Sequence, residues 1–523
     1  MSKPGTRSIA LLLASALVIS LGAQAPVAPP GLDALVERVR STFDVPGISL
    51  AIVKDDKVVV ARGYGVRRLG NPTPVDGRTL FGIASNSKVF TATALGLLVE
   101  EGKVAWDAPV VRYLPWFQLS DPYVTRELTI RDLLVHRSGL GLGAGDLLWW
   151  PPSTYTRREI AQRLRYVPLD TSFRSAYAYD NVLYLVAGEV IESSSGQTWE
   201  DFIRTRILAR VGMSTSHPRF DTTVNGGNVA TPHARVEERV RAVQPFASDN
   251  TNPAGGILSN AEDMAKWMRV LLRQGQLEDG TRLFSEATWR QISGLVTPMP
   301  NPEPPAELAP LRTFVQGYAL GLNVREYRGH GALTHTGGLV GLVSRVLLIP
   351  DIGLGVSVLT NQESGEAFNA LTYSVADHYL MAPPFDWVRQ LDLFRGRNLA
   401  RTAEAELKSA QSRDATSKPS LPLAKYAGTY TDAWYGDIEI TEGAGQLRIR
   451  FTKTPALAGT LEHWQHNTFV ARWTDRELRA DAFVTFALKP DGSIERARME
   501  AVSPATDFSF DFQDLVLLPQ IRR

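Results

Sequence analysis

A stretch of apolar residues between positions 81 and 104 predicts a helix that is buried on nearly every face. Apolar side chains fill most positions from Val89 to Val99, and Gly102 is suited to end the helix. A helix that is apolar all round packs inside a domain rather than on its surface. We therefore expect this helix to lie at the centre of the larger domain of the chain.

Alternating apolar and polar residues predict one antiparallel sheet whose strands come from both ends of this domain. A helix pattern over Leu32–Phe43 precedes two strand patterns that are separated by the polar turn Asp55-Asp56, which predicts a hairpin. The strand patterns lie at residues 47–53, 58–64, 318–326, 332–335, 342–349 and 354–359. Helical patterns dominate residues 106–207 between them. The predicted fold class is α/β (α+β), with an antiparallel sheet flanked by helices and a helical lobe.

A second unit with many short strands follows residue 381. A charged helix is predicted at 387–410 and a polar linker at 412–422. Strand patterns follow at residues 436–441, 447–452, 468–473, 482–488, 495–501 and 508–512. About 100 residues with this pattern predict a small β-barrel. We therefore divide the chain into a main domain over 31–381, a helix and linker over 382–422 and a barrel domain over 423–523.

The first 25 residues have the pattern of an export signal. Lys3 and Arg7 precede an apolar run over 9–22, and the Ala-Gln-Ala tripeptide ending at Ala25 is a small-x-small cleavage site. We expect cleavage after Ala25 and a periplasmic or secreted protein, with an uncleaved N-terminal anchor as the alternative. No later stretch is long and uncharged enough to predict a stable membrane span.

Composition narrows the possible functions. The 523 residues include 56 Lys and Arg against 55 Asp and Glu, which gives a net charge of +1 and no basic surface for nucleic acid. The chain has no cysteine, so neither a disulfide framework nor a thiol nucleophile is possible.

Ser85 and Lys88 begin the buried helix and supply the first candidate chemistry. Three residues apart on a helix, their side chains share one face, and the serine sits at the positive end of the helix dipole. A buried amine is harder to protonate than an exposed one, so it can accept the serine proton near neutral pH. Ser-x-x-Lys occurs by chance on solvated helices, but no other lysine of this chain has a serine three positions before it. We interpret Ser85 as a nucleophile that Lys88 activates.

Tyr179-Asp180-Asn181 precedes an apolar helix predicted at 182–191. A tyrosine beside a lysine ammonium can shuttle a proton between the serine and the leaving group. The Asn181 amide can contact a substrate carbonyl and hold Lys88. The alternative is a loop tyrosine that packs its ring and an asparagine that caps the helix.

Thr334-His335-Thr336-Gly337-Gly338 leaves a predicted strand. Paired glycines let the backbone approach a ligand closely, and an N–H there can form an oxyanion hole with the N–H of Ser85. A histidine in a strand is otherwise most often a structural hydrogen-bonding residue.

Three short motifs, in this order and with a helical lobe between them, resemble those of the serine β-lactamase and penicillin-binding protein superfamily. They are Ser85-x-x-Lys88, Tyr179-x-Asn181 and His335-Thr336-Gly337. The similarity extends to residues 128–140, 253–268 and 351–361. It is greatest to the class C β-lactamase-like branch, which includes esterases, D-aminopeptidases and D-Ala-D-Ala carboxypeptidases. The predicted barrel resembles the lipocalin-like domain often fused to this branch.

The resemblance implies a role for each motif. Ser85 would be the acylated nucleophile, Lys88 its activating partner and Tyr179 the general base and acid. Whether Lys88 or Tyr179 accepts the serine proton is left open. The remaining positions would support the substrate: Asn181, His335 with Thr336 and Gly337 in place of Lys-Thr-Gly, and the N–H groups of Ser85 and Gly338 as the oxyanion hole.

Two departures from the family pattern bear on the substrate. His335 stands where a lysine is common, and histidine is mostly neutral at pH 7, so it suits the carboxylate of a β-lactam less well. Asp180 stands where serine is common and would add negative charge at the cleft. We therefore place peptide or ester hydrolysis above β-lactam hydrolysis.

Three functions remain after these arguments. The leading one is an exported serine peptidase or amidase that works through an acyl-Ser85 intermediate on a small peptide or amide. The second is a carboxylesterase with the same site, since no Gly-x-Ser-x-Gly elbow points to an α/β-hydrolase. The third is a penicillin-binding or β-lactamase-type protein that deacylates slowly, or a pseudo-enzyme that presents its barrel. The oligomeric state is left open.

The barrel suggests no cofactor. Its aromatic residues at period two are more typical of a core than of a ligand cavity. His463-x-x-His466 has metal-like spacing only on a helix, so we predict no metal site there. We expect the barrel to narrow access to the cleft or to mediate oligomers.

Overall fold

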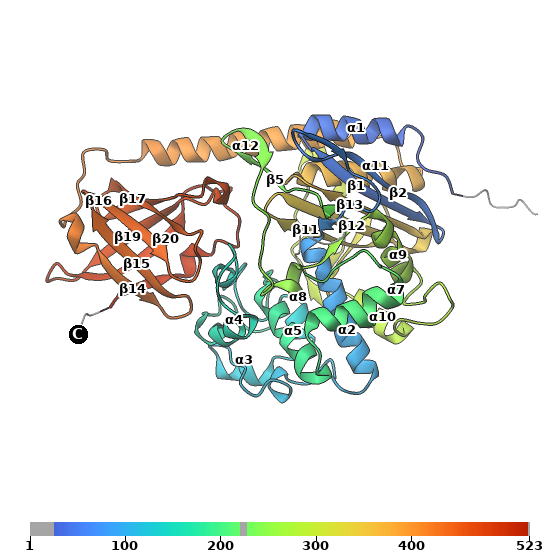
Figure 1. Cartoon of the computed structure of the whole chain (residues 1–523), viewed down its shortest axis with the longest axis horizontal. Helices are drawn as coiled ribbons and strands as arrows, with labels where there is room; N and C mark the ends of the chain where they lie inside the picture. Colours follow the sequence, from blue (N-terminus) through green and yellow to red (C-terminus); the bar gives the residue numbers. More distant parts are fainter. Residues whose placement is uncertain (1–25, 220–226, 521–523) are drawn as a thin grey trace, which may run out of the picture.

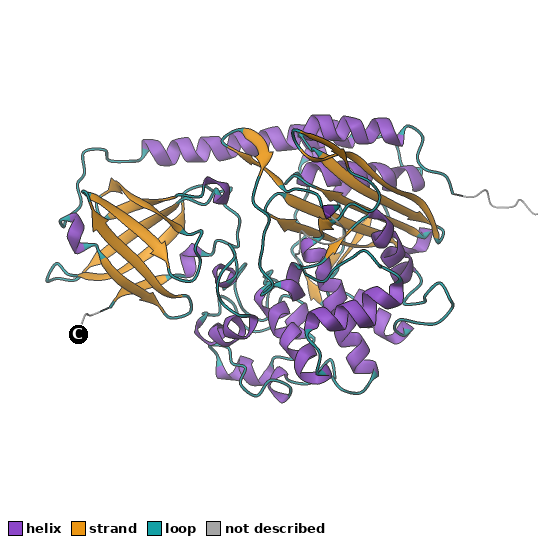
Figure 2. Cartoon of the chain, in the orientation of Figure 1, coloured by secondary structure: helices purple, strands orange, loops and turns teal. Residues whose placement is uncertain are grey.

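A nine-stranded antiparallel sheet forms the frame of the first domain, with its strands in the order β3-β2-β1-β13-β12-β11-β10-β9-β8 (Figures 1 and 2). Its strands are β1 Gly47–Lys54, β2 Lys57–Arg68, β3 Asn71–Pro74, β8 Thr297–Pro298, β9 Gln316–Tyr318, β10 Asn323–Tyr327, β11 His330–Leu339, β12 Leu342–Ile349 and β13 Leu354–Thr360. Ile48 of β1 lies opposite Thr360 of β13, which joins the N-terminal hairpin to the later strands. The predicted sheet, with strands from both ends of the domain, is therefore confirmed.

The computed structural model describes residues 26–219 and 227–520, so the predicted export signal over 1–25 lies outside the described residues. Within those two ranges, no helix combines the length and the apolar character that a membrane span requires.

Helices cover both faces of the sheet. On β1, Ile48, Leu50 and Ile52 belong to one core with α1 (Leu32–Phe43) and α11 (Gly365–Tyr379), while Ala51 and Val53 face the other core. Successive side chains of a strand point to opposite faces, so β1 is buried along its length because both of its faces are covered. The second core includes α9 (Ala261–Leu272) and α2 (Lys88–Glu100).

The helical lobe surrounds α2, which is buried from Lys88 to Leu98 as its sequence predicts. Its other helices include α3 Pro122–Glu127, α4 Arg157–Arg163, α5 Val182–Ser195, α6 Trp199–Phe202 and α8 Asn252–Gly255. One detail of the prediction is corrected. Ser85 lies in a 3₁₀ turn, Ala84–Ser87, and Lys88 is the first residue of the α-helix.

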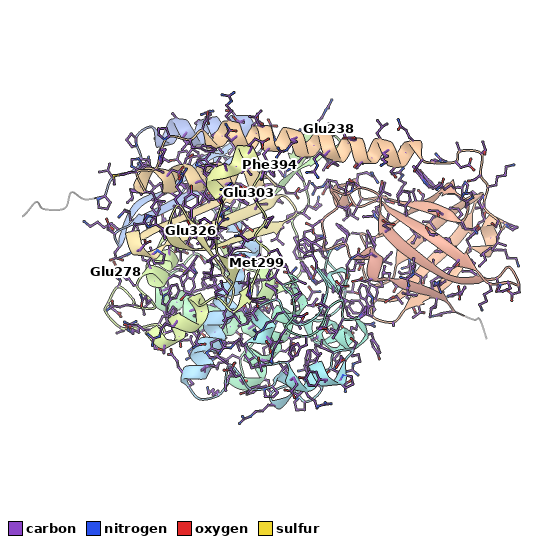
Figure 3. The ribbon with its side chains drawn as sticks, turned by 180° about the vertical axis from the view of Figure 1, so that it is seen from behind. Glu238, Glu278, Met299, Glu303, Glu326 and Phe394 are labelled. Carbon is purple, nitrogen blue, oxygen red and sulfur yellow. The ribbon has the colours of Figure 1, made fainter. Side chains whose placement is uncertain are left out.

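Helix α12 (Trp387–Gln411) leaves the sheet domain and runs across to the barrel (Figure 1). Its first half packs on the sheet domain, where Phe394 contacts the core; Figure 3 shows Phe394 from behind on the same long helix. The second half of the helix is largely exposed. A covalent connection of this kind does not by itself fix the barrel, so the contacts described below matter.

Eight strands close the barrel. They are β14 Gly428–Asp432, β15 Gly436–Gly443, β16 Gln446–Phe451, β17 Ala458–Gln465, β18 Thr468–Trp473, β19 Ala482–Leu488, β20 Ile494–Ala501 and β21 Val516–Pro519. Five of the six predicted strands are present, and β14, β17 and β21 were not predicted. The predicted strand at 508–512 is wrong: these residues form a loop that continues into the 3₁₀ turn Phe512–Asp514.

The barrel aromatics form a core, with one exception on the outer face. Trp434, Tyr435 and Trp473 are buried inside, as are Phe469 and Phe486. Trp464 and Phe483 instead contact each other at 5.3 Å and are only partly buried. His463 lies in β17 and His466 in the turn that follows, where the φ of His466 is 47°, so the two residues do not share one strand.

Candidate active site

Ser85 and Lys88 are in hydrogen-bond contact. Lys88 Nζ lies 3.1 Å from Ser85 Oγ, and it also donates to Asn181 Oδ1 at 2.7 Å and to the Ala254 carbonyl at 3.0 Å. The last two partners can only accept hydrogen bonds. A neutral Lys88 has two N–H groups for these acceptors, which leaves its lone pair facing the Ser85 hydroxyl. The contact set therefore suits an amine that removes the serine proton.

Lys88 is wholly buried, and its surroundings shift its pKa in opposite directions. Burial lowers its pKa to about 7, while the carboxylates of Asp146 and Asp180 raise it. The rings of Tyr179 and Tyr184 lie 4.9 and 5.1 Å from Nζ, an arrangement that favours the ammonium form. Because the pKa is near neutrality, Lys88 can both take and return a proton.

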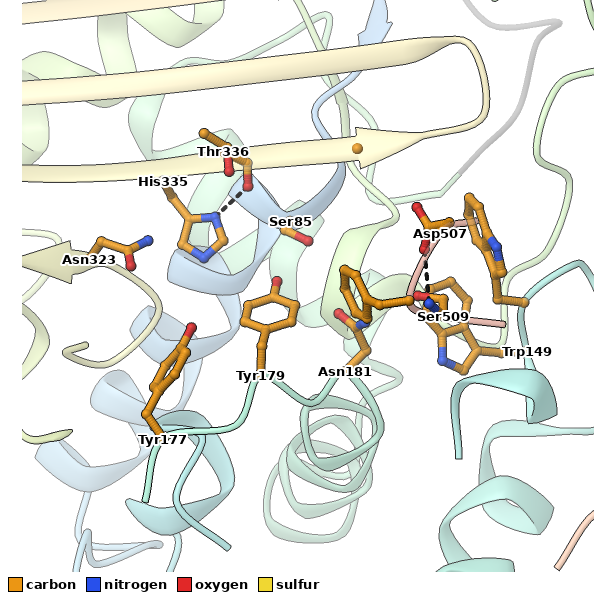
Figure 4. Close-up of a pocket in the computed structure, with 13 residues that line it drawn as sticks. Ser85, Trp149, Tyr177, Tyr179, Asn181, Asn323, His335, Thr336, Asp507 and Ser509 are labelled. Atoms are coloured by element: carbon orange, nitrogen blue, oxygen red, sulfur yellow. Dashed lines mark hydrogen bonds between the residues drawn. The ribbon is translucent and has the colours of Figure 1, made fainter. Parts of the chain in front are cut away.

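Tyr179 and Asn181 occupy the loop that leads into α5, and both point toward Ser85 and β11 (Figure 4). Burial raises the pKa of Tyr179 well above its usual value, although a hydrogen bond with Ser85 lowers it. Tyr179 is therefore a phenol in the free protein, suited to donate a proton. The sequence prediction that these residues meet Ser85 and Lys88 agrees with this placement.

Asp180 does not lie where we expected it. Its side chain is fully buried behind the loop, its N–H donates to His136 Nδ1 at 3.1 Å, and its Oδ2 is 3.5 Å from Ser138 Oγ. The interpretation that Asp180 adds negative charge at the cleft is therefore wrong. Its charge acts on Lys88 from within the lobe instead.

His335 on β11 is a neutral residue with a defined tautomer. Its Nδ1 is 2.6 Å from the Thr336 carbonyl, which can only accept, so the proton lies on Nδ1. Nε2 then accepts a hydrogen bond from the Tyr318 hydroxyl at 2.7 Å. Burial lowers the pKa of His335 to about 3. His335 therefore offers no positive charge to a substrate.

The glycines after Thr336 let β11 approach the serine turn. A Cβ on Gly337 would lie 2.4 Å from the Ile83 carbonyl oxygen, so only glycine fits there. Gly338 has free space at its Cβ position and lines the same cavity as Ser85.

The cavity in front of Ser85 measures about 330 Å³ (Figure 4). Residues that the sequence pointed to form one part of its wall: Ser85, Tyr179, Asn181, His335, Thr336 and Gly338. Sequence reasoning missed the rest: Trp149, Trp150, Tyr177, Asn323, and Asp507, Phe508 and Ser509 from the barrel domain. Asp507, Phe508 and Ser509 lie next to or within the strand that was wrongly predicted at 508–512, so they were not predicted to line a cavity.

Comparisons with known proteins agree with this geometry. The β-lactamase family profile matches residues 32–380, and a domain of unknown function, DUF3471, matches residues 412–518. The chain belongs to the β-lactamase family. The predicted recognition is thus confirmed, and the chain is a serine hydrolase of this family.

Several relatives of this β-lactamase-family hydrolase cover most of its length. The unguisins hydrolase ungD' of Aspergillus campestris is 30% identical over 77% of the chain and 76% of the relative. A D-aminopeptidase of Cereibacter sphaeroides is 26% identical over 87% of the chain and 84% of the relative. The octameric penicillin-binding protein homologue from Pyrococcus abyssi has a similar fold, with a TM-score of 0.57 at 21% identity, covering 93% of this chain and 99% of that one.

The barrel of this β-lactamase-family chain reaches the cavity through one loop, residues 502–515, which we call the barrel loop. The Asp511 carboxylate accepts hydrogen bonds from the backbone N–H groups of Gly145 at 2.7 Å and Leu147 at 3.0 Å. Phe508 covers Gly143, where a Cβ would come within 2.8 Å of its ring and backbone. The barrel loop is therefore fixed to the lobe beside the reaction centre.

Among the described residues that line the cavity, one side chain is anionic and none is cationic. Asp507 stands at the rim, where its Oδ1 accepts a hydrogen bond from the Ser509 N–H at 2.9 Å. Among the residues that the structure describes, no lysine, arginine or histidine forms an ion pair with Asp507. Lys88 is enclosed behind Ser85 and Asn181 and does not line the cavity.

Proposed function

We propose that the protein hydrolyses an amide bond in a small peptide or amino-acid amide that carries a free amino group, through an acyl-Ser85 intermediate. The observation that carries this proposal is the cavity itself, which is lined by both Ser85 and Asp507, with Lys88 buried behind Ser85. A protonated amine would find an unpaired carboxylate there, and its amide carbonyl could face Ser85. The similarity to a D-aminopeptidase over most of both chains supports the same substrate class.

Acylation begins with Lys88. Its lone pair takes the Ser85 proton while Oγ attacks the amide carbon, and the carbonyl oxygen becomes an oxyanion. The N–H groups of Ser85 and Gly338 would stabilise that charge. When the C–N bond breaks, Tyr179 gives its phenolic proton to the leaving nitrogen. The tyrosinate then stands beside the Lys88 ammonium, so the pair carries no net charge.

Deacylation reverses these proton movements. A water molecule gives one proton to Tyr179 and adds its oxygen to the acyl carbon. The ester bond to Ser85 breaks, and Oγ recovers its proton from the Lys88 ammonium. The products are the free acid and the amine released earlier, and all three side chains return to their starting states.

The charges of the cavity argue against a substrate that presents a carboxylate. His335 is neutral, and Asp507 would repel an anion. A β-lactam or the C-terminal end of a peptide carries such a carboxylate close to the bond that is cut. We therefore propose hydrolysis of amides that carry a free amino group, rather than penicillin binding.

We also propose that the enzyme works outside the cytoplasm. The basic, apolar and small-residue segments of residues 1–25 support export.

The test compares paired substrates that differ in one charge. D- and L-amino-acid amides with a free amine are measured against their N-acetylated forms, a nitrophenyl ester and a chromogenic β-lactam. Asp507→Asn should lower kcat/KM for the free amines by about tenfold or more, because a hydrogen bond to a charged group contributes roughly 1.5–3 kcal/mol. The acetylated forms should change little.

Asp491→Asn, on an exposed turn of the same barrel, is the matched control. Preference for acetylated or carboxylate-bearing substrates would contradict the proposed substrate class. Turnover of esters alone would instead favour the carboxylesterase.

A further inference from the structure

Asp146 is a buried carboxylate that connects the reaction centre to the barrel. It is fully enclosed at the start of the 3₁₀ turn Asp146–Leu148. Its Oδ2 accepts hydrogen bonds from Asn181 Nδ2 at 2.9 Å and from Ser509 Oγ at 2.8 Å, and its Oδ1 accepts one from Trp149 Nε1 at 2.8 Å. Both oxygens are thus used, and the donors come from two domains.

These contacts determine which way the Asn181 amide faces. A carboxylate can only accept, so the NH₂ group of Asn181 must point to Asp146 and its oxygen to Lys88. The opposite orientation would set two donors against each other at Lys88 and two acceptors at Asp146. The orientation of Asn181 in turn takes one Lys88 N–H away from Ser85. Asp146 therefore influences the lysine without touching it.

The barrel holds this carboxylate at two places. Ser509 is 4% exposed and donates directly to it. Asp511, two residues on, accepts the N–H groups of Gly145 and Leu147, which flank Asp146 on either side. The barrel loop thus fixes both the backbone and the side chain of the turn that carries Asp146.

We propose that Asp146 is a positioning residue for Lys88, and that Ser509 of the barrel domain maintains it in that role. A continuous series of hydrogen bonds links Ser509, Asp146, Asn181, Lys88 and Ser85. The C-terminal domain would then contribute to acylation itself and not only to the shape of the cavity. This inference rests on the proposed function, because it assumes that Lys88 takes the proton of Ser85.

The charge of Asp146 gives the inference a readout in pH. The ionisable groups that face Lys88 or Asp146 are Asp180, Tyr179, Tyr184, His136, His335 and Asp511. Burial raises the pKa of Asp146 to about 7, while the hydrogen bond from Ser509 lowers it. Loss of the Ser509 hydroxyl should leave Asp146 less ionised. Lys88 then loses part of a stabilising anion, so its own pKa should fall.

The test follows the rate at which a fluorophosphonate phosphonylates Ser85, with loss of fluoride, as a function of pH and with the full chain. Attack by Ser85 on the probe needs neutral Lys88, so the rate should rise with pH through the lysine pKa. Ser509→Ala should lower the plateau rate by about tenfold, and Asp146→Asn by up to about 100-fold, because an amide has one acceptor oxygen for three donors. In both variants the rising limb should move to lower pH.

Thr506→Val is the matched control, because Thr506 lies in the same barrel loop and its hydroxyl has no hydrogen-bond partner among the described atoms. Its rate should stay within about twofold of the wild type. Ser509→Ala keeps the Asp511 anchor, so it remains informative if Asp146→Asn does not fold.

An unchanged pH profile of the labelling rate in Ser509→Ala would overturn the inference. A lower plateau rate with no shift of the rising limb along the pH axis would also overturn it, because a purely structural contact gives that result. Ser85→Ala separates the two proposals. Labelling that persists in Ser85→Ala refutes the proposed function, whereas labelling of Ser85 together with wild-type behaviour of Ser509→Ala and Asp146→Asn refutes only the positioning role.

Discussion

The turn that carries Ser85 and the barrel loop that carries Ser509 line the same cavity, yet they are held there in different ways. Ser85 meets Lys88 because the two residues are three positions apart, where the 3₁₀ turn Ala84–Ser87 runs into the first residue of α2. Ser509 meets Asp146 across 363 positions of sequence, through a loop that Asp511 ties to the lobe.

The contact between Ser85 and Lys88 thus follows from their spacing in the sequence, whereas the position of Ser509 follows from contacts between the two domains. The spacing of Ser85 and Lys88 is set locally, although the serine turn is also held by β12, where Ser344 Oγ donates to the Ile83 carbonyl and accepts from Asn86 Nδ2. No local spacing sets the position of the barrel loop. It depends on two buried carboxylates, Asp511 of the loop and Asp146 of the lobe, each of which accepts hydrogen bonds from the other domain. Substitutions in the two regions should therefore lower kcat/KM to different extents.

Removing the lysine amine should have the largest effect. Lys88→Ala leaves Ser85 without its base, so kcat/KM for amides should fall by at least about 1,000-fold, as for other members of a catalytic unit. Steady-state kinetics measure this loss. Lys103→Ala, at the exposed end of the same segment, is the control, and a loss below tenfold for Lys88→Ala would contradict the role of the amine.

Loosening the barrel loop should have an intermediate effect. In Asp511→Asn, one oxygen remains for the two N–H groups of Gly145 and Leu147. We expect kcat/KM to fall by about tenfold, since one buried N–H then lacks an acceptor at a cost of roughly 1–3 kcal/mol. Kinetics combined with amide hydrogen exchange of residues 502–515 test this. Wild-type exchange and kinetics together would show that Asp511 does not hold the loop.

A change on the outer face of the barrel should have the smallest effect. Trp464→Ala removes the contacts with Phe483 and with the Arg413 guanidinium, which lies 5.0 Å from the ring. Because neither touches the barrel loop, kcat/KM should stay within about twofold while thermal stability falls slightly. A fivefold loss of activity would mean that the barrel acts through more than this loop.

The sequence predicted the parts of the site that depend on local pattern. Ser85 and Lys88 follow from helix spacing, and Gly337 follows from the need for close backbone approach. The barrel loop was misread because Phe508, Phe510 and Phe512 alternate with polar residues as in a strand. In the structure Ser509 and Asp511 are buried as well, since the loop is enclosed between two domains.

Asp146, on the lobe, is a second residue whose role the sequence did not reveal. Its neighbours Gly145 and Leu147 gave no sign that an aspartate there would receive donors from Asn181 and Ser509. Such contacts join residues far apart in the chain, and no periodic pattern records them. The neutral state of His335, in contrast, was expected from its ordinary pKa and is reinforced by burial, which lowers that pKa further.

The most direct test of the account is to find which residue acts as the nucleophile. After reaction of the full chain with a fluorophosphonate, peptide mapping by mass spectrometry should place one adduct on Ser85, and Ser85→Ala should be neither labelled nor active on amino-acid amides. An adduct on any other residue, or amide hydrolysis by Ser85→Ala at the wild-type rate, would contradict it.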